Sequence, residues 1–179
     1  MAFEEKCIKA NNVFQGRILS VYNDDVLDGA GKPCKREVIK HPGGACALYV
    51  EGGKVAFVKQ YRYAYGEEVL ELPAGKLEKG EDPCLAALRE LAEETGITAK
   101  KEDAELLFVM YPTPGYTDEK IYIYHVKQGE QKVSNPDEGE FVETIFMPLD
   151  EAKTLLASGK LHDAKTIVAL QAYLLKNNG

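Results

Sequence analysis

The chain has 179 residues, which is enough for one domain with a substantial hydrophobic core. Its formal net charge is −7 and no block of basic residues stands out, so we do not expect a nucleic-acid partner. No apolar run approaches the roughly 18 residues of a membrane span, and the first residues lack the apolar core of a signal peptide. The cysteines show no zinc-type pairing, which is typical of reduced thiols. We therefore expect a cytoplasmic protein without a membrane partner.

Strand signals dominate the chain before residue 75. We expect extended segments at residues 13–22, 36–41, 45–50, 55–61 and 69–72, and a turn-rich stretch at 23–35. The two central segments flank Glu51-Gly52-Gly53-Lys54, which favours a hairpin.

A helix is predicted directly before Gly96. Asp82 is suited to cap its N-terminus, Pro83 fits the first helical position, and Gly96 suits the left-handed residue that ends a helix. Residues at three- and four-residue spacing are expected to face the core: Leu85, Leu88, Leu91, Ala92 and Thr95.

Three further strands and two helices are expected after this helix. The strands are predicted at residues 105–110, 121–126 and 143–147. Asp150 is expected to cap a helix that stops near Gly159, and Asp163 to open a last helix. The core stripe of that last helix is Ile167, Leu170 and Leu174. Strands around a central helix, followed by terminal helices, favour an α/β or α+β layered domain.

Residues 75–97 carry the strongest chemical signal. They contain one arginine, Arg89, and five glutamates: Glu78, Glu81, Glu90, Glu93 and Glu94. So many neighbouring carboxylates repel one another unless a cation shares them. Oxygen ligands favour Mg²⁺ or Mn²⁺ over zinc, and the usual substrate of such a site is a phosphate.

This segment resembles the Nudix box, a pattern of glycine, five residues, glutamate, seven residues, Arg-Glu, an aliphatic residue, any residue, Glu-Glu, any residue, glycine and an aliphatic residue. Every fixed position is satisfied, by Gly75, Glu81, Arg89, Glu90, Leu91, Glu93, Glu94, Gly96 and Ile97. The resemblance implies a Nudix α/β/α sandwich with a mixed β-sheet over residues 41–179. It also implies that residues 1–40 form a small N-terminal β region at a homodimer interface.

The resemblance also implies roles for the box residues. Glu90, Glu94 and the main-chain carbonyl of Ala74 are expected to bind Mg²⁺, for which Mn²⁺ is a possible substitute. Glu93 is expected to contribute to the same catalytic cluster. Arg89 is expected to orient the carboxylates by ion pairing, a role that suits its planar guanidinium.

Two segments outside the box resemble the ADP-ribose pyrophosphatase branch of the family. In the stretch from Gln60 to Glu68, Arg62 is the expected substrate-binding arginine, although the tyrosines beside it are also consistent with a sheet face. In the loop 111–119, Pro112 follows Gly96 by sixteen residues (112 − 96), an offset that marks this branch. There we expect Gly115, Thr117 and Glu119 to contact the terminal ribose, although a rigid turn explains the same residues.

An acidic loop at residues 135–141 completes the expected site. By the same resemblance, Glu138 is placed as the general base and Glu140 as a further metal ligand, with Asp137 and Glu143 as open alternatives. Arg36 is a candidate substrate contact. An aromatic residue is expected to stack on adenine, and the choice between Phe14 and Tyr22 stays open.

The expected activity is Mg²⁺-dependent hydrolysis of ADP-ribose to AMP and ribose 5-phosphate. Three alternatives are weighed: a pyrophosphatase for another nucleoside diphosphate sugar such as GDP-mannose, a Nudix module that senses ADP-ribose without cleaving it, and an enzyme that sanitises oxidised nucleoside triphosphates. The last fits less well with the long N-terminal region and the loop at Pro112. The intact box argues against the sensor.

Overall fold

The computed structural model describes residues 3–134 and 141–177. The chain divides into two compact units, which are described separately. The N-terminal unit consists of Met1–Gly43 together with Tyr111–Lys120, and the main unit consists of Gly44–Met110 together with Ile121–Gly179. A loop from the second half of the sequence therefore belongs with the first 43 residues, which the sequence did not indicate.

The N-terminal unit is a four-stranded antiparallel sheet with β3 at its centre. Its strands are β1 (Lys6–Lys9), β2 (Asn12–Gln15), β3 (Ser20–Leu27) and β4 (Pro33–Lys40). β1 pairs with the C-terminal half of β3, β2 pairs with its N-terminal half, and β4 pairs along its whole length.

One strand prediction and one turn prediction in this unit were wrong in their boundaries. Residues 13–22 are not one extended segment, because the chain turns where the N–H of Gly16 donates to the carbonyl of Leu19 at 2.9 Å. Residues 23–27 are not a turn but continue β3, and the turn lies at Asp28, whose carboxylate accepts from the N–H of Ala30 and of Lys32. Pairing with β4 outweighs the weak strand preference of the polar residues there.

The loop 111–120 is joined to the end of β4. The N–H of Ile39 donates to the carbonyl of Tyr116 at 2.7 Å, and the N–H of Asp118 donates back to Ile39 at 3.1 Å. The carboxylate of Asp118 then accepts from the N–H of His41 at 3.0 Å and from Lys40 Nζ at 2.9 Å. These bonds explain why the loop belongs to the N-terminal unit.

The main unit contains a seven-stranded mixed sheet of order β10-β11-β5-β6-β13, with β7 paired to β6 and β8 paired to β5. Its strands are β5 (Gly44–Glu51), β6 (Lys54–Arg62), β7 (Glu67–Glu71), β8 (Ala74–Lys76), β10 (Ala104–Met110), β11 (Ile121–Val126) and β13 (Val142–Pro148). β11 and β5 are parallel, and the other pairs are antiparallel. Gly52 and Gly53 have φ values of 57° and 72°, and they form the expected hairpin turn between β5 and β6.

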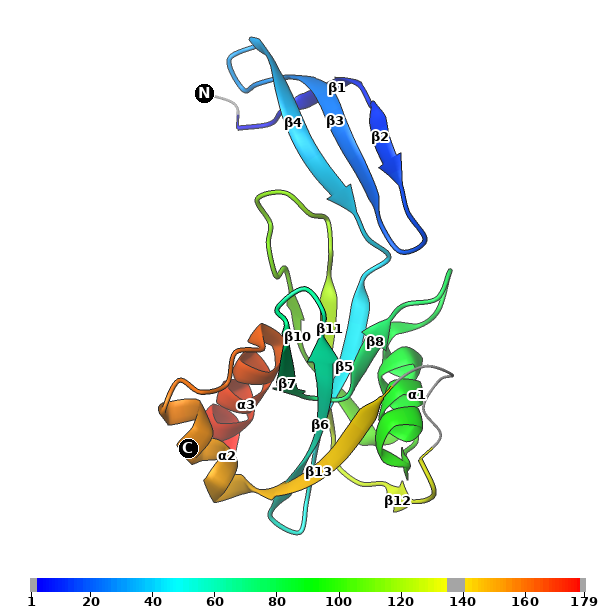
Figure 1. Ribbon diagram of the computed structural model, residues 1–179, viewed down its shortest axis with the longest axis vertical. Helices are drawn as coiled ribbons and strands as arrows, with labels where there is room; N and C mark the ends of the chain where they lie inside the picture. The colour runs from blue at the N-terminus through cyan, green and yellow to red at the C-terminus, as the bar shows by residue number, and fades with distance from the viewer. Residues whose placement is uncertain (1–2, 135–140, 178–179) are drawn as a thin grey trace. The chain divides into compact units, whose positions relative to one another are not determined.

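The remaining elements are short strands and helices. Two short strands pair outside the large sheet, β9 (Ile97–Thr98) and β12 (Glu130–Gln131). The helices are α1 (Pro83–Thr95), the 3₁₀ helix η1 (Lys101–Asp103), α2 (Leu149–Ala157) and α3 (Ala164–Asn177). Figure 1 shows α1 on one side of the sheet and α2 and α3 on the other. In the described part of the chain, no helix has the length and apolarity needed to cross a membrane.

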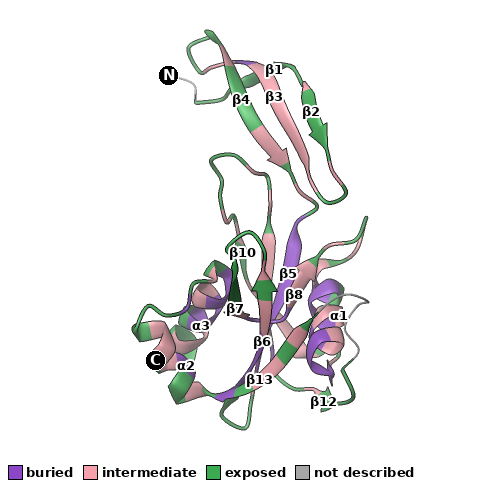
Figure 2. Ribbon diagram, in the orientation of Figure 1, coloured by how far each residue is buried: buried purple, intermediate pink, exposed green. Residues whose placement is uncertain are grey.

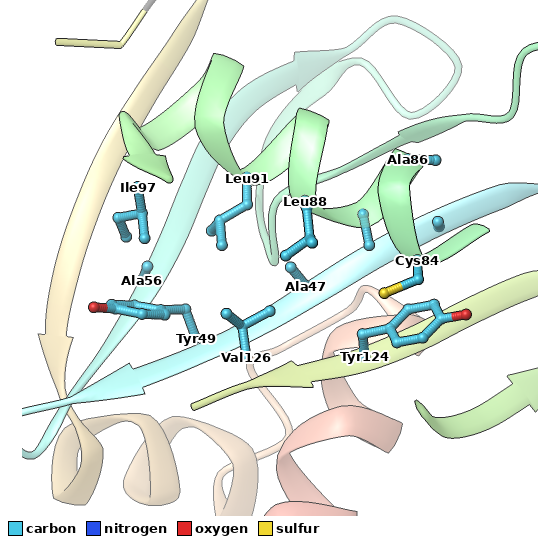
Figure 3. Packing of buried hydrophobic residues seen from close by; sticks show 12 residues of the cluster. Ala47, Tyr49, Ala56, Cys84, Ala86, Leu88, Leu91, Ile97, Tyr124 and Val126 are labelled. Atoms are coloured by element: carbon cyan, nitrogen blue, oxygen red, sulfur yellow. The ribbon is translucent and has the colours of Figure 1, made fainter. Parts of the chain in front are cut away.

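The sheet is covered on both faces, as the alternation along β5 demonstrates. Ala45, Ala47 and Tyr49 pack in a cluster with α1, which Figure 3 shows from close by. Cys46 and Leu48 point the other way, into a cluster with α3. Figure 2 shows β5 buried between the helical layers. The expected α/β/α sandwich with a mixed sheet is therefore confirmed.

Two local helix predictions were wrong. Leu85 of α1 is half exposed, and the small residues Ala86 and Ala87 lie against the sheet in its place. Asp150 does not cap α2, because the helix begins at Leu149 and the Asp150 carboxylate pairs with a lysine one turn later. In contrast, the caps predicted for α1 and α3 are present, as described below.

Candidate active site

The ends of α1 are fixed by local chemistry. The carboxylate of Asp82 accepts from the N–H of Cys84 at 2.9 Å and from that of Leu85 at 3.3 Å, and Pro83 occupies the first turn. At the other end Gly96 takes a left-handed φ of 76°, and its N–H donates to the carbonyl of Ala92. These caps set the helix register and thereby the positions of its acidic residues.

Arg89 lies at the centre of an ion-pair cluster. Its Nε and Nη2 donate to the two carboxylate oxygens of Glu81, at 3.0 and 3.2 Å. Its Nη1 donates to Glu90 Oε1 at 2.7 Å and to Glu93 Oε2 at 3.0 Å. The hydrogen bonds to Glu81 raise the pKa of Arg89, and the guanidinium lowers the pKa of Glu81 in return. One arginine therefore holds three carboxylates that would otherwise repel one another.

Glu94 is buried at the junction of α1 with the sheet. It is 4% exposed, and its Oε2 accepts from the N–H of Ala74 at 3.0 Å. The hydroxyl of Thr144 on β13 donates to the main-chain carbonyl of Glu94 at 2.7 Å. These contacts bring the main chain of Ala74 next to a carboxylate of the box helix, twenty positions later in the sequence.

Gly75 shows how tightly the box loop approaches the helix. A Cβ atom built at Gly75 would overlap the carboxylate of Glu90, so any larger residue would displace that side chain. Carboxylate oxygens and a main-chain carbonyl form a donor set suited to a hard divalent cation. Within residues 3–134 and 141–177, no three acidic, histidine or cysteine side chains form a preformed cation site. The residues present therefore suit a divalent cation by the chemistry of their donor atoms, while in the structure Arg89 pairs with the carboxylates of Glu90 and Glu93.

Arg62 lies at the end of β6 and is partly exposed. Its Nε and Nη2 donate to the two oxygens of Glu71, at 2.5 and 2.7 Å. Hydrogen bonding to Glu71 is the main cause of its raised pKa, to which the charge of Glu94 also contributes. The neighbouring Tyr63 and Tyr65 are 92% and 80% exposed, so they do not form a packed sheet face.

The other expected substrate residues lie in the N-terminal unit. Arg36 pairs with the carboxylate of Glu5, with an Nε–Oε2 distance of 2.8 Å. In the loop 111–120, Glu119 Oε1 lies 3.4 Å from His41 Nδ1, and the N–H of Glu119 donates to Thr117 Oγ1 at 3.2 Å. Among the described residues, no heavy atom outside Gly115 and its two chain neighbours lies within 4 Å of a Cβ built at Gly115. Thr117 and Glu119 therefore form one local cluster at the end of β4.

The expected general base, Glu138, and the expected metal ligand, Glu140, lie outside the described residues, as does the alternative base Asp137. Glu143, the other alternative, is 63% exposed and pairs with Lys59 at 2.8 Å. Of the two candidate stacking residues, Phe14 is 55% exposed and Tyr22 is partly buried.

Sequence reasoning missed one group of residues near Arg62. Glu71, Asp163 and Lys165 form a continuous series of ion pairs with it. No spacing rule connects these residues, because Glu71 and Lys165 are 94 positions apart. The available signal was the charged Glu71 within the apolar run 69–72, a pattern that requires a buried partner.

Comparison with known proteins agrees with this geometry. A model of the NUDIX domain matches residues 39–170. The chain is 42% identical over 178 residues to the ADP-ribose pyrophosphatase of Bacillus subtilis (strain 168), covering 98% of this chain and 95% of that protein. It is also 42% identical over 173 residues to the methanol dehydrogenase activator of Bacillus methanolicus, covering 94% and 92% of the two chains.

A solved structure described as an ADP compounds hydrolase aligns with a TM-score of 0.84 at 21% sequence identity, covering 100% of this chain and 98% of that chain. At that identity the likeness concerns the fold alone, and it confirms the architecture predicted from the box. The match of the domain model and the full-length relatives together show that the chain belongs to the Nudix hydrolase family, whose members generally use divalent metal ions.

Proposed function

We propose that this Nudix hydrolase cleaves the pyrophosphate bond of ADP-ribose, giving AMP and ribose 5-phosphate, with Mg²⁺ as the cation. The observation that carries the proposal is the cluster of Glu81, Glu90 and Glu93 around Arg89 on an intact box helix. The identity of 42% to an ADP-ribose pyrophosphatase over nearly the whole chain supports the choice of substrate.

The residues of the box would hold the cation. Glu90, Glu94, the carbonyl of Ala74 and Glu140 form the proposed ligand set, and Glu93 belongs to the same cluster. The bound cation would neutralise charge on the phosphoryl oxygens and lower the pKa of the attacking water. Arg89 keeps the carboxylates oriented toward one another before the cation arrives.

Further side chains are proposed to carry the remaining steps. Glu138 is proposed to accept the proton of the attacking water. Arg62 is proposed to bind a phosphate, because a guanidinium with its orientation fixed by a carboxylate is suited to pair with a second oxyanion. Thr117 and Glu119 are proposed to hydrogen-bond the terminal ribose, with Arg36 as a further substrate contact.

We further propose that the enzyme is a cytoplasmic homodimer in which the N-terminal unit contributes to the interface. Its sheet carries exposed apolar side chains, including Ile8, Val13 and Phe14, which a second subunit would cover.

One product analysis with a single variant tests the activity. Purified protein is incubated with ADP-ribose and saturating Mg²⁺, and AMP release is followed by chromatography. Glu94→Gln is expected to lower the rate by about 10²–10⁴, because it removes one charge from the cation site. Glu151→Gln, an exposed glutamate on α2, is the matched control and is expected to keep the parent rate. Equal rates for Glu94→Gln and the parent would exclude the proposed role of Glu94.

A substrate panel separates the nearest alternative. GDP-mannose and ADP-ribose are compared at equal concentration, with GMP and AMP as the detected products. Faster release of GMP would assign the enzyme to another nucleoside diphosphate sugar. Binding of ADP-ribose without release of AMP would indicate a sensing module.

A further inference from the structure

Four residues of the main unit form a line of alternating charges between the sheet and α3. Arg62 pairs with Glu71 through both of its carboxylate oxygens. Glu71 Oε2 also accepts from Lys165 Nζ, and Lys165 in turn pairs with Asp163 at 2.9 Å. The order in space is therefore Arg62, Glu71, Lys165 and Asp163, which alternates plus and minus.

The two central members are buried and charged. Glu71 is 2% exposed and Lys165 is 8% exposed. Burial acts to raise the pKa of Glu71, but the hydrogen bond from Arg62 and the charge of Lys165 outweigh it and the pKa is lowered. Burial likewise opposes the charge of Lys165, but Asp163 and Glu71 outweigh it and its pKa is raised. Both groups are therefore ionised at neutral pH.

The negative end of the line is compensated by the start of α3. Asp163 Oδ2 accepts from the N–H of Thr166 at 3.0 Å and from its hydroxyl at 2.6 Å, as a capping residue does. The positive end of the helix dipole lies at this point and offsets the charge of Asp163. Because the helix dipole offsets part of the charge of Asp163, the line as a whole carries a partial positive charge.

Arg62 is the partly exposed end of the line. Its Nε and Nη2 are taken by Glu71, and within the described part of the chain its Nη1 makes no hydrogen bond. Its side chain is 41% exposed, which leaves that nitrogen open to a ligand. The negative charge of Glu94, one of the box carboxylates, also contributes to the raised pKa of Arg62.

The same helix start also holds the main chain that leads into the site. Thr166 Oγ1 accepts from the N–H of Leu72 at 2.8 Å, in a buried hydrogen bond. Leu72 lies two residues before Ala74, whose N–H binds Glu94. The cap of α3 therefore contacts both the ion-pair line and the strand that joins the box.

We propose that Glu71, Lys165 and Asp163 are positioning residues that act through Arg62, holding its guanidinium as a fixed cation for a phosphate of the substrate. Lys165 has the decisive part, because without it the charge of Glu71 would cancel that of Arg62. This inference rests on the proposed function and deepens it, since it assigns the phosphate contact to an arginine whose support comes from α3.

A double-mutant cycle on KM tests the inference. Lys165→Met is expected to raise KM for ADP-ribose by about 10- to 100-fold, the effect of weakening one charge-assisted hydrogen bond, while kcat changes less. In a background of Arg62→Met, the same Lys165→Met change is expected to have no further effect on KM. Lys153→Met on α2, which breaks an exposed lysine–aspartate pair, is the matched control and is expected to keep both constants.

A purely structural role gives a different result. Lys165→Met would then lower Tm without changing KM, or would raise KM by the same factor with and without Arg62, and either outcome overturns the inference. If Lys165→Met does not fold, Lys165→Gln replaces it in the cycle, because glutamine removes the positive charge while it can still donate a hydrogen bond to Glu71.

Failure of the proposed function is recognised separately. If the parent releases no AMP, the activity proposal falls. The parent, Lys165→Met, Arg62→Met and the double variant are then compared by their Kd for ADP, measured by calorimetry. An effect of Lys165→Met on Kd that vanishes in the Arg62→Met background still supports the positioning role, and an effect that persists there overturns it.

Discussion

Replacement of Arg89 by lysine tests whether the arginine and a divalent cation pair with the same carboxylates of the box. In the structure, Arg89 makes four hydrogen bonds to three carboxylates, those of Glu81, Glu90 and Glu93. Lysine keeps the charge but has a single nitrogen, which cannot reach carboxylates on opposite sides of a planar guanidinium. Arg89→Lys therefore leaves at least one buried or half-buried carboxylate poorly paired.

The size of the effect follows from the contacts that are lost. Loss of two charge-assisted hydrogen bonds at a side chain that is 30% exposed is worth about 2–3 kcal/mol after allowance for solvent screening. For a chain of 179 residues this corresponds to a Tm lower by about 4–12 °C. A divalent cation supplies the positive charge that the carboxylates then lack, so saturating Mg²⁺ should recover more than half of the loss.

The assay is thermal denaturation in EDTA and in saturating Mg²⁺. Arg89→Lys is expected to show the larger gain in Tm on addition of Mg²⁺. Lys101→Met removes an exposed pair with Asp82 beside the same helix and serves as the control, with a small change that is equal in both buffers. If Arg89→Lys lowers Tm equally with and without Mg²⁺, arginine and cation do not share the same carboxylates, and the reasoning on the cation site is refuted.

Two further predictions concern close packing and acid stability. Gly75→Ala places a methyl group where the carboxylate of Glu90 lies, and a displacement of about 1 Å should lower kcat by about 10²-fold; steady-state kinetics at the parent level would contradict it. Lys176 and Lys127 lower the pKa of Glu105 to about 2, below the value of about 4.3 of an unfolded chain. Because the folded pKa is the lower one, Glu105 stabilises the fold above about pH 4.3 and loses this effect as the pH falls toward 2. Urea titrations from pH 7 to 2 should therefore show the deficit of Glu105→Gln shrinking in that window, and a constant deficit would argue against these ion pairs.

Features set by neighbouring residues were predictable from the sequence. The caps of α1 depend on Asp82, Pro83 and Gly96, which lie within one turn of the positions that they satisfy. The hairpin between β5 and β6 depends on Gly52 and Gly53, whose positive φ values the turn requires. In each case the interaction joins residues that are close in the sequence, so the spacing of residue types is enough to predict it.

Features set by distant partners were not predictable in this way. Residues 23–27 continue β3 because β4 pairs with them, although their own composition favours a turn. The loop 111–120 belongs with the N-terminal unit because Ile39 donates to the carbonyl of Tyr116 and accepts from the N–H of Asp118, nearly eighty positions later in the sequence. The box pattern placed Arg89 among carboxylates, but its two-point contact with Glu81 became visible only in the structure.

At the start of α3, a distant partner also determines the position of a charged residue, which the sequence alone did not predict. Helical periodicity predicted an apolar stripe, and Leu170 of that stripe is indeed 1% exposed. Periodicity treats Lys165 as a solvent residue, yet Glu71 from β7 holds it in the interior. A buried ion pair seldom stabilises a fold more than a well-packed apolar pair would. An apolar contact would therefore fix α3 to the sheet equally well. It would not provide a carboxylate that accepts two hydrogen bonds from Arg62, with a lysine that balances the charge of this carboxylate.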